Sequence, residues 1–188
     1  MLKAQIEKSL QILQAGGLIL YPTDTVWGIG CDATNTEAVE KVFKLKGRES
    51  SKSLIILLDT ENKLDAYVQD VPVIAYDLVE YAEAPLTIIY SGAKNLAPNV
   101  IANDGSIGIR IVKHDFCKQL LQRFKKPIVS TSANLSGSPT PTNFQEIEDE
   151  IRTGVNYIVA LEQDDFTPKK SSTIMKLEAD GRFAFIRR

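Results

Sequence analysis

Apolar residues recur along the chain with two different periods, one typical of helices and one typical of strands. A spacing of three to four residues places Leu2, Ile6, Leu10 and Leu13 on one face of a helix that ends at a Gly-Gly pair. The same period predicts further helices over residues 35–45, 71–81, 115–124 and 143–151. Short apolar runs between turn residues predict strands over residues 18–21, 53–58, 86–90, 107–112, 128–129, 157–161, 173–177 and 183–186.

The order of these elements limits the fold class. Helices and strands interleave, but several strands follow one another without a helix between them. A purely parallel sheet needs a long crossover, usually a helix, between its strands. We therefore predict an α/β fold in which helices pack on a mixed parallel and antiparallel sheet.

Composition and charge narrow the class of protein further. The chain has 188 residues, of which 44% are hydrophobic, and 22 Lys and Arg against 24 Asp and Glu give a net charge of −2. This length predicts one domain over residues 1–188, and the composition excludes a disordered chain. A protein that coats nucleic acid would need a more basic surface. Two distant cysteines form neither a disulfide framework nor a zinc site. With no apolar leader or membrane-spanning run, we expect a soluble, cytoplasmic protein.

Polar segments follow several of the predicted strands, at the place where open α/β sheets usually bind ligands. Residues 21–28 form the first segment, in which Thr23, Asp24 and Thr25 offer two hydroxyls and a carboxylate after Pro22. Each of these residues alone is typical of a turn or a helix cap. Trp27 suits either the core or a pocket wall. Together the residues of this segment favour a binding site.

A cluster of cations lies in this slightly acidic chain: Lys41, Lys44, Lys46, Arg48 and Lys52. The C-terminus of a helix and contact with solvent account for Lys41 and Lys44. Lys46 and Arg48 instead flank Gly47, and a glycine lets the backbone approach a ligand closely. A planar guanidinium beside a compact ammonium suits a polyphosphate or a carboxylate.

Two hydroxyl-rich segments complete the candidate chemistry. Residues 130–137 include Ser132 and Asn134 and come directly after the buried run 128–129. Such a segment can hydrogen-bond phosphate or ribose without adding charge, although polar surface loops are common. Residues 169–173, which include Ser172, are weaker evidence on their own. The sequence has no Walker, Rossmann or zinc-protease motif, and its single histidine argues against a Ser-His-Asp triad.

In this order, the segments resemble the YrdC/TsaC family of L-threonylcarbamoyladenylate synthases, in its short, single-domain form. The resemblance rests on residues 22–28, on Lys46 and Arg48, and on residues 130–137 and 171–173. Residues 86–89 and 108–110 also match the family's Leu-Thr and Gly-x-Arg strands. The resemblance covers nearly the whole chain. Trp27 stands where the family usually has Tyr, and residues 82–85 replace its usual Pro-Gly-Pro.

This resemblance implies a twisted, YrdC/RibB-like sheet around an open, concave, positively charged pocket. It also implies that L-threonine, bicarbonate and ATP, with Mg²⁺ bound to the ATP and no structural metal, give threonylcarbamoyl-AMP, pyrophosphate and water. This nucleotidyltransferase reaction serves tRNA modification, in which a downstream threonylcarbamoyl transferase complex passes the group to the adenosine beside the anticodon. Weak contact with tRNA is compatible with this role, and no membrane partner is expected.

The resemblance also assigns roles to residues. Lys46 and Arg48 are expected to be catalytic. The residues expected to bind ATP or its phosphates are Lys46, Arg48, Thr87, Ser132, Asn134 and Ser172. L-Threonine is expected to bind at Thr23 and at Arg110, which would contact its carboxylate. The residues expected to line the pocket are Thr25, Trp27 and Lys52.

Two rival functions fit parts of the sequence. The cations between residues 41 and 52 suit an RNA-binding or ribosome-associated factor of the same fold without synthase activity. Against this, the segment lacks the interleaved aromatic residues of a base-stacking platform. A carbamoyl-transfer domain of hydrogenase maturation proteins shares these motifs, but those proteins also carry zinc-finger segments, and this chain has two cysteines. Threonine-dependent turnover of ATP would distinguish the synthase from both.

Overall fold

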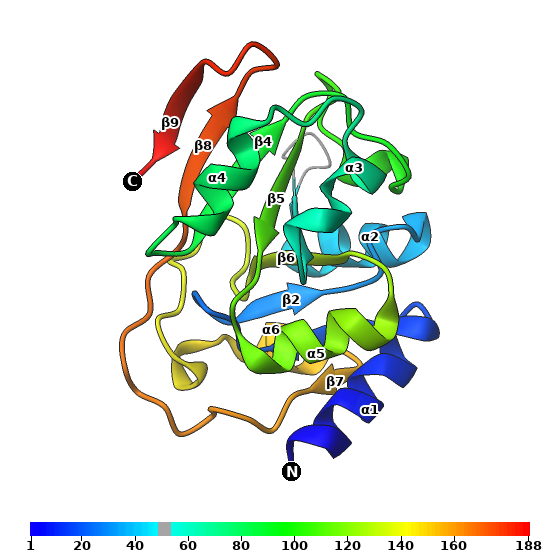
Figure 1. The fold of residues 1–188 in the computed structure, drawn as a ribbon. Helices are drawn as coiled ribbons and strands as arrows, with labels where there is room; N and C mark the ends of the chain where they lie inside the picture. The colour runs from blue at the N-terminus through cyan, green and yellow to red at the C-terminus, as the bar shows by residue number, and fades with distance from the viewer. Residues whose placement is uncertain (49–53) are drawn as a thin grey trace.

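The structure, a computed structural model, describes residues 1–48 and 54–188 (Figure 1). Within these ranges the strands form one nine-stranded sheet in the order β7-β1-β2-β6-β3-β5-β4-β8-β9. Their bounds are β1 (Ile19–Tyr21), β2 (Gly28–Gly30), β3 (Ile55–Leu58), β4 (Leu86–Tyr90), β5 (Ile107–Ile111), β6 (Ile128–Ser132), β7 (Tyr157–Ile158), β8 (Thr173–Leu177) and β9 (Phe183–Arg187). The sheet contains parallel pairs such as β3–β5 and β4–β8 and antiparallel pairs such as β3–β6 and β4–β5, so the predicted mixed sheet is confirmed.

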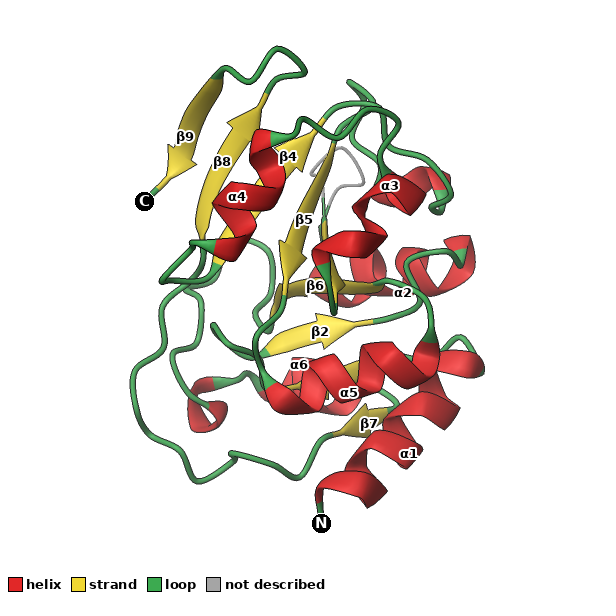
Figure 2. Cartoon of the chain, in the orientation of Figure 1, coloured by secondary structure: helices red, strands yellow, loops and turns green. Residues whose placement is uncertain are grey.

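Helices cover both faces of this sheet (Figure 2). Their bounds are α1 (Leu2–Gln14), α2 (Thr36–Lys46), α3 (Leu64–Tyr67), α4 (Ile74–Glu80), α5 (Asp115–Phe124) and α6 (Asp149–Gly154), with 3₁₀ turns η1 (Glu61–Lys63), η2 (Pro98–Val100) and η3 (Phe144–Glu146). Apolar residues of α1 and α5 form one core cluster with β1, while α2 and α6 contribute to a larger cluster. No helix in the described ranges is long and apolar enough to cross a membrane.

The strands of the sheet change direction along it. Figure 1 shows β2 and β6 running across the view, whereas β5, β8 and β9 run steeply along it. Such a change of direction is the twist that L-amino acids impose on a sheet, accumulated over many strands. The twist turns one face into a concave surface, and the candidate site lies there.

Most of the predicted elements are present, with several differences; among them, α3 was not predicted, and the strand predicted over residues 157–161 ends at Ile158. The predicted helices over residues 2–13, 35–45 and 115–124 are confirmed as α1, α2 and α5. The helix predicted over residues 143–151 is wrong, because the backbone is extended at Ile147 and Glu148 and separates η3 from α6. The strand predicted over residues 128–129 continues to Ser132, so the hydroxyls of residues 130–132 lie on β6 and not in a loop.

Strand β2 was not predicted, since glycine weakens a strand. Close neighbours explain both of its glycines, and for Gly30 the nearest is the ring of Tyr21. A Cβ atom on Gly30 would lie 2.6 Å from Cε1 of Tyr21 and 3.0 Å from the carbonyl oxygen of Val129. On Gly28 it would lie 3.1 Å from Oγ of Ser130. The glycines therefore let β1, β2 and β6 pack closely around a fully buried tyrosine.

Candidate functional site

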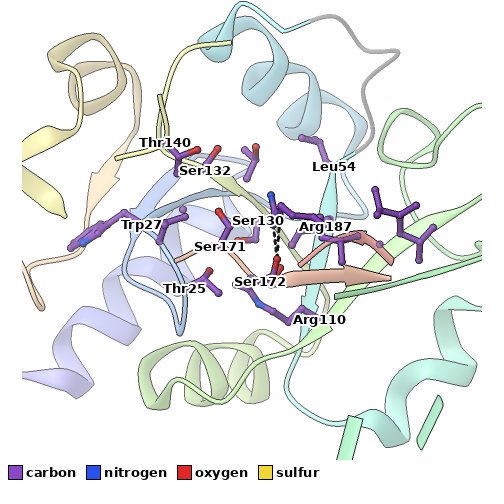
Figure 3. Close-up of a pocket in the computed structure, with 18 of the residues that line it drawn as sticks. Thr25, Trp27, Leu54, Arg110, Ser130, Ser132, Thr140, Ser171, Ser172 and Arg187 are labelled. Carbon is purple, nitrogen blue, oxygen red and sulfur yellow. Dashed lines mark hydrogen bonds between the residues drawn. The ribbon is translucent and has the colours of Figure 1, made fainter. Parts of the chain in front are cut away.

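A cavity of about 350 Å³ lies on the concave face of the sheet (Figure 3), within the size range of small-molecule sites. Strand alternation explains its position, because Ile107 and Ile109 of β5 enter the core whereas Gly108 and Arg110 face the cavity. The cavity is lined by the cations Arg48, Arg110 and Arg187, and no carboxylate is found among its described lining residues. Such a lining favours an anionic ligand.

Arg110 is the most buried of the three arginines, with 3% of its surface exposed. Its Nη2 lies 3.2 Å from Oδ1 of Asp24 and 3.5 Å from Oγ1 of Thr23. The other carboxylate oxygen of Asp24 accepts a hydrogen bond from the backbone N–H of Lys113 at 3.1 Å. Asp24 therefore compensates part of the charge of Arg110 and orients its guanidinium, which leaves the cavity face of the fork for a ligand.

The Thr23 side chain supports this segment from behind the cavity. Its hydroxyl donates to the carbonyl oxygen of Val26 at 2.8 Å and lies 2.9 Å from the hydroxyl of Thr25. Thr25 and Trp27 belong to the cavity lining. The Trp27 ring also packs against Phe144, with ring centroids 4.8 Å apart, so the side chain is both a core residue and a pocket wall.

Arg187, which sequence reasoning missed, reaches the cavity from β9. In the β8–β9 ladder, Met175 pairs with Phe185 and Ile174 with Arg187, so Ile186 is an extra residue in a bulge. Ile186 and Arg187 both line the cavity as a result. Burial lowers the pKa of Arg187, and the positive charge of Arg110 lowers it further. Two guanidinium groups that repel each other favour a shared anion between them.

Hydroxyl groups occupy much of the remaining wall. Ser130, Thr131 and Ser132 come from β6, and Figure 3 shows Thr140, Ser171 and Ser172 around the same cavity. Oγ of Ser172 lies 2.8 Å from Oγ1 of Thr87, which is fully buried beneath it. Thr87 is therefore a support for Ser172 and does not line the cavity.

Comparison with known proteins supports a family assignment. A family model named for Sua5, YciO and YrdC, and described as "Telomere recombination", matches residues 11–188. The chain belongs to the Sua5/YciO/YrdC family. A threonylcarbamoyl-AMP synthase from Pseudoalteromonas translucida (strain TAC 125) is 34% identical over 160 residues, which are 84% of this chain and 86% of that protein.

Solved structures of the Sua5/YciO/YrdC family confirm the fold. YciO from E. coli superimposes with a TM-score of 0.85 at 24% identity, covering 100% of this chain and 90% of its own. Sua5 from P. abyssi in complex with L-threonine gives a TM-score of 0.82 at 24% identity, covering 92% of this chain and 50% of its own. The chain therefore spans about half the length of Sua5, and the twisted, YrdC-like α/β fold implied by the sequence is confirmed.

The residues expected from the family resemblance fall into two groups. Those that line the cavity are Thr25, Trp27, Arg48, Arg110, Ser132 and Ser172. Those that lie behind or beside it are Thr23, Lys46, Thr87 and Asn134. Lys52 lies outside the described residues. The cavity wall also contains Ser106 and Thr140, which were not predicted. Serine and threonine are common in polar loops, so the sequence does not distinguish these two from residues at the surface.

Lys46 and Arg48, which were expected to act together on the phosphates, have different environments. Gly47 has φ of +56° and ends α2 with two C-cap hydrogen bonds, and among the described residues beyond its neighbours no atom lies within 4 Å of where its Cβ would be. The positive φ of this turn requires the glycine. Beside it, Arg48 faces the cavity, but Lys46 is 2% exposed, and burial together with the charge of Arg48 lowers the pKa of Lys46 to about 8.

Proposed function

We propose that this protein is an L-threonylcarbamoyl-AMP synthase, a nucleotidyltransferase that uses L-threonine, bicarbonate and ATP. The observation that carries the proposal is the carboxylate-free lining of the described cavity, in which Arg48, Arg110 and Arg187 converge among hydroxyl groups. ATP, bicarbonate and the threonine carboxylate are all anions, so this lining suits all three. The names of relatives such as the 34% identical synthase from Pseudoalteromonas translucida support the same activity.

Arg48 and Arg187 are proposed to bind the phosphates of ATP. Both guanidinium groups lose part of their hydration in the cavity, and burial lowers the pKa of each. A partly desolvated guanidinium, such as that of the half-buried Arg48, binds phosphate more strongly than one in water because the local dielectric constant is lower. The hydroxyls of Ser132 and Thr140 lie on the wall formed by β6 and the following loop, where they would donate to phosphate or ribose oxygens.

Arg110 is proposed to bind the carboxylate of L-threonine. Asp24 and Thr23 already contact one edge of its guanidinium, which fixes the fork before the ligand arrives. The Sua5 structure that contains L-threonine shows that a protein of this fold binds the amino acid. Thr25, which lines the cavity beside Arg110, offers a hydroxyl for the polar atoms of the amino acid.

The proposed chemistry needs positioning and charge stabilisation more than covalent help from the protein. Bicarbonate takes up a proton and releases water to give CO₂, and the threonine amine then adds to CO₂ and loses a proton to give a carbamate. A carbamate oxygen then attacks the α-phosphorus of ATP, and the bond to the β-phosphate oxygen breaks to release pyrophosphate. The arginines would bring two anionic reactants together and stabilise the charge of the transition state.

Mg²⁺ is proposed only as the ion that ATP carries. The described residues contain no cluster of three or more His, Cys, Asp or Glu that could hold a metal, and carboxylates are the usual protein ligands of Mg²⁺. We also propose that the reaction takes place in the cytoplasm. The product would pass from there to a transferase complex that modifies tRNA.

The decisive experiment measures pyrophosphate release by the purified protein with ATP, bicarbonate and L-threonine. Omitting any one substrate should abolish release, and the product should have the mass of threonylcarbamoyl-AMP. Replacing L-threonine by L-valine tests whether the hydroxyl is recognised. Salt-sensitive RNA binding with no threonine-dependent turnover would overturn the proposal in favour of an RNA-binding factor of the same fold.

A further inference from the structure

Lys46 is a charged side chain that is almost completely buried beside the cavity. It is the last residue of α2, and 2% of its surface is exposed. Its Nζ donates hydrogen bonds to the carbonyl oxygens of Ser132 and Asn134, both at 2.5 Å. Two of the three N–H bonds of the ammonium are therefore used on the backbone of one loop, and the group is not among the cavity lining.

The segment that Lys46 contacts, here called loop 132–140, begins at the last residue of β6 and continues through the turn that follows it. The backbone carbonyl of Lys46 accepts a further hydrogen bond from the N–H of Ser136 at 2.8 Å. Inside the loop, Nδ2 of Asn134 donates to the carbonyl oxygens of Leu135 and Ser138, both at 2.8 Å. Lys46 and Asn134 thus bind four carbonyl oxygens and one N–H group of this segment.

Glu148 holds the same loop from the other side. Its Oε2 accepts from the backbone N–H of Leu135 at 3.1 Å, and its Oε1 accepts from the hydroxyl of Ser138 at 3.0 Å. The carboxylate also attracts the Lys46 ammonium electrostatically. The loop is therefore held by hydrogen bonds to Lys46 at the end of α2 and to Glu148 at the start of α6.

The two ends of this loop meet the cavity. Ser132 precedes the turn and Thr140 follows it, and both line the cavity (Figure 3). A shift of the carbonyl oxygens at residues 132 and 134 would move these two hydroxyls. The geometry points to Lys46 as a positioning residue: its ammonium fixes loop 132–140 so that Ser132 and Thr140 face the nucleotide, and it does not itself contact the phosphates. This inference rests on the proposed function for the identity of the nucleotide.

The first test needs no turnover. Hydrogen exchange of the loop amides, above all those of Leu135 and Ser136, is measured in the protein without ligand for wild type and Lys46→Met. Positioning predicts that exchange in the loop becomes at least about tenfold faster while amides of β3 and β5 are unchanged. Lys44→Met, which removes an exposed lysine from the same helix, should leave the loop as it is. Unchanged loop exchange in Lys46→Met would overturn the inference.

The second test separates positioning from direct contact by a double-mutant cycle on ATP affinity. Thr140→Val should weaken ATP binding in the wild type but have little further effect in Lys46→Met, because the hydroxyl is already displaced there. Additive effects would mean that Lys46 contacts ATP independently, and would also overturn the inference. Arg48→Ala serves as the comparison, since a direct ligand should be additive with Thr140→Val.

Two further points keep these tests interpretable. If Lys46→Met does not fold, Lys46→Arg keeps the charge but replaces the compact ammonium by a planar fork, and it should also speed loop exchange. If the wild type binds ATP but shows no threonine-dependent pyrophosphate release, the proposed function fails. Loop exchange and the ATP-binding cycle still decide the role of Lys46 in that case.

Discussion

Arg187 donates two hydrogen bonds to the carbonyl oxygen of Ser172, from Nε at 3.1 Å and from Nη2 at 2.8 Å. The pair joins the last strand of the sheet to the residue that precedes β8, and Figure 3 shows this contact within the cavity. Ser172 in turn contacts Thr87 of β4 through its hydroxyl. The backbone therefore fixes the Arg187 side chain. A ligand that binds its remaining N–H groups loses less affinity to side-chain ordering than it would with a flexible arginine.

Arg187→Ala should raise the KM for ATP by about 10- to 100-fold, since a hydrogen bond to a charged group contributes about 1.5–3 kcal/mol. Arg187→Lys should give an intermediate value, because an ammonium restores the charge without the planar fork. The measurement is steady-state pyrophosphate release at varied ATP concentration. The control is Arg182→Ala, just before the same strand. The Arg182 side chain is 80% exposed, so its removal should leave the KM for ATP unchanged. Equal effects of the two variants would contradict the role of Arg187.

The helices and the core were more predictable from the sequence than the site. α1, α2 and α5 follow a clear apolar period, and Asn35 caps α2 by accepting from the N–H of Ala38. Strand β2 was missed because its glycines are required by close contacts with Ser130 of β6 and Tyr21 of β1, which a local pattern does not show. The break at Ile147 was missed because nothing local in the sequence forces an extended backbone there.

Parts of the site depend on contacts between distant segments, which a single sequence does not reveal. Arg187 reaches the cavity through a bulge in the β8–β9 ladder, and its sequence neighbours Arg182 and Arg188 are equally basic. The Lys-x-Arg pair was recognised, but its two members have different environments. Lys46 is buried against the carbonyl oxygens of residues 132 and 134, whereas Arg48 lines the cavity, and only the packing of α2 against the loop separates them.

Arg110→Lys should raise the KM for L-threonine by about 10- to 100-fold and change the KM for ATP much less. Lysine keeps a positive charge next to Asp24, so the buried carboxylate is not left unpaired, but the bidentate fork is lost. The measurement is pyrophosphate release at varied threonine and saturating ATP. Arg123→Lys, a half-exposed arginine of α5, is the matched control. An unchanged threonine KM in Arg110→Lys would place the threonine carboxylate elsewhere.

Glu162 lies in the long connection between β7 and β8 and contacts His114 at the start of α5. Its Oε1 lies 2.6 Å from Nε2 of His114, and its Oε2 accepts from Nζ of Lys169 at 2.5 Å. Burial raises the pKa of Glu162, but the hydrogen bonds of Lys169 and His114 outweigh it and keep the pKa below the ordinary value of 4.5. The carboxylate therefore contributes stability that is fully present above pH 4.5 and is lost as the pH falls through the lower, folded-state pKa.

Glu162→Gln should lower the urea midpoint of unfolding at pH 7 and lose most of this difference at pH values below the folded-state pKa. The comparison is wild type against variant at several pH values between 7 and 3. Asp164→Asn changes an exposed carboxylate of the same connection and should show no such pH-dependent difference. A Glu162→Gln effect that is the same at pH 7 and at pH 3 would mean that the glutamine disturbs packing and that the ion pairs contribute nothing.

Gly30→Ala should destabilise the protein by about 1–3 kcal/mol, the usual cost of overpacking a well-filled core. The added Cβ would lie 2.6 Å from Cε1 of Tyr21 and 3.0 Å from the carbonyl oxygen of Val129, so the ring or the strands must move. Urea unfolding of Gly30→Ala, Tyr21→Leu and the double variant measures the coupling. Because leucine removes the ring atom that Cβ meets, Gly30→Ala should cost less in the Tyr21→Leu background. An equal cost in both backgrounds would show that the ring is not the reason for the glycine.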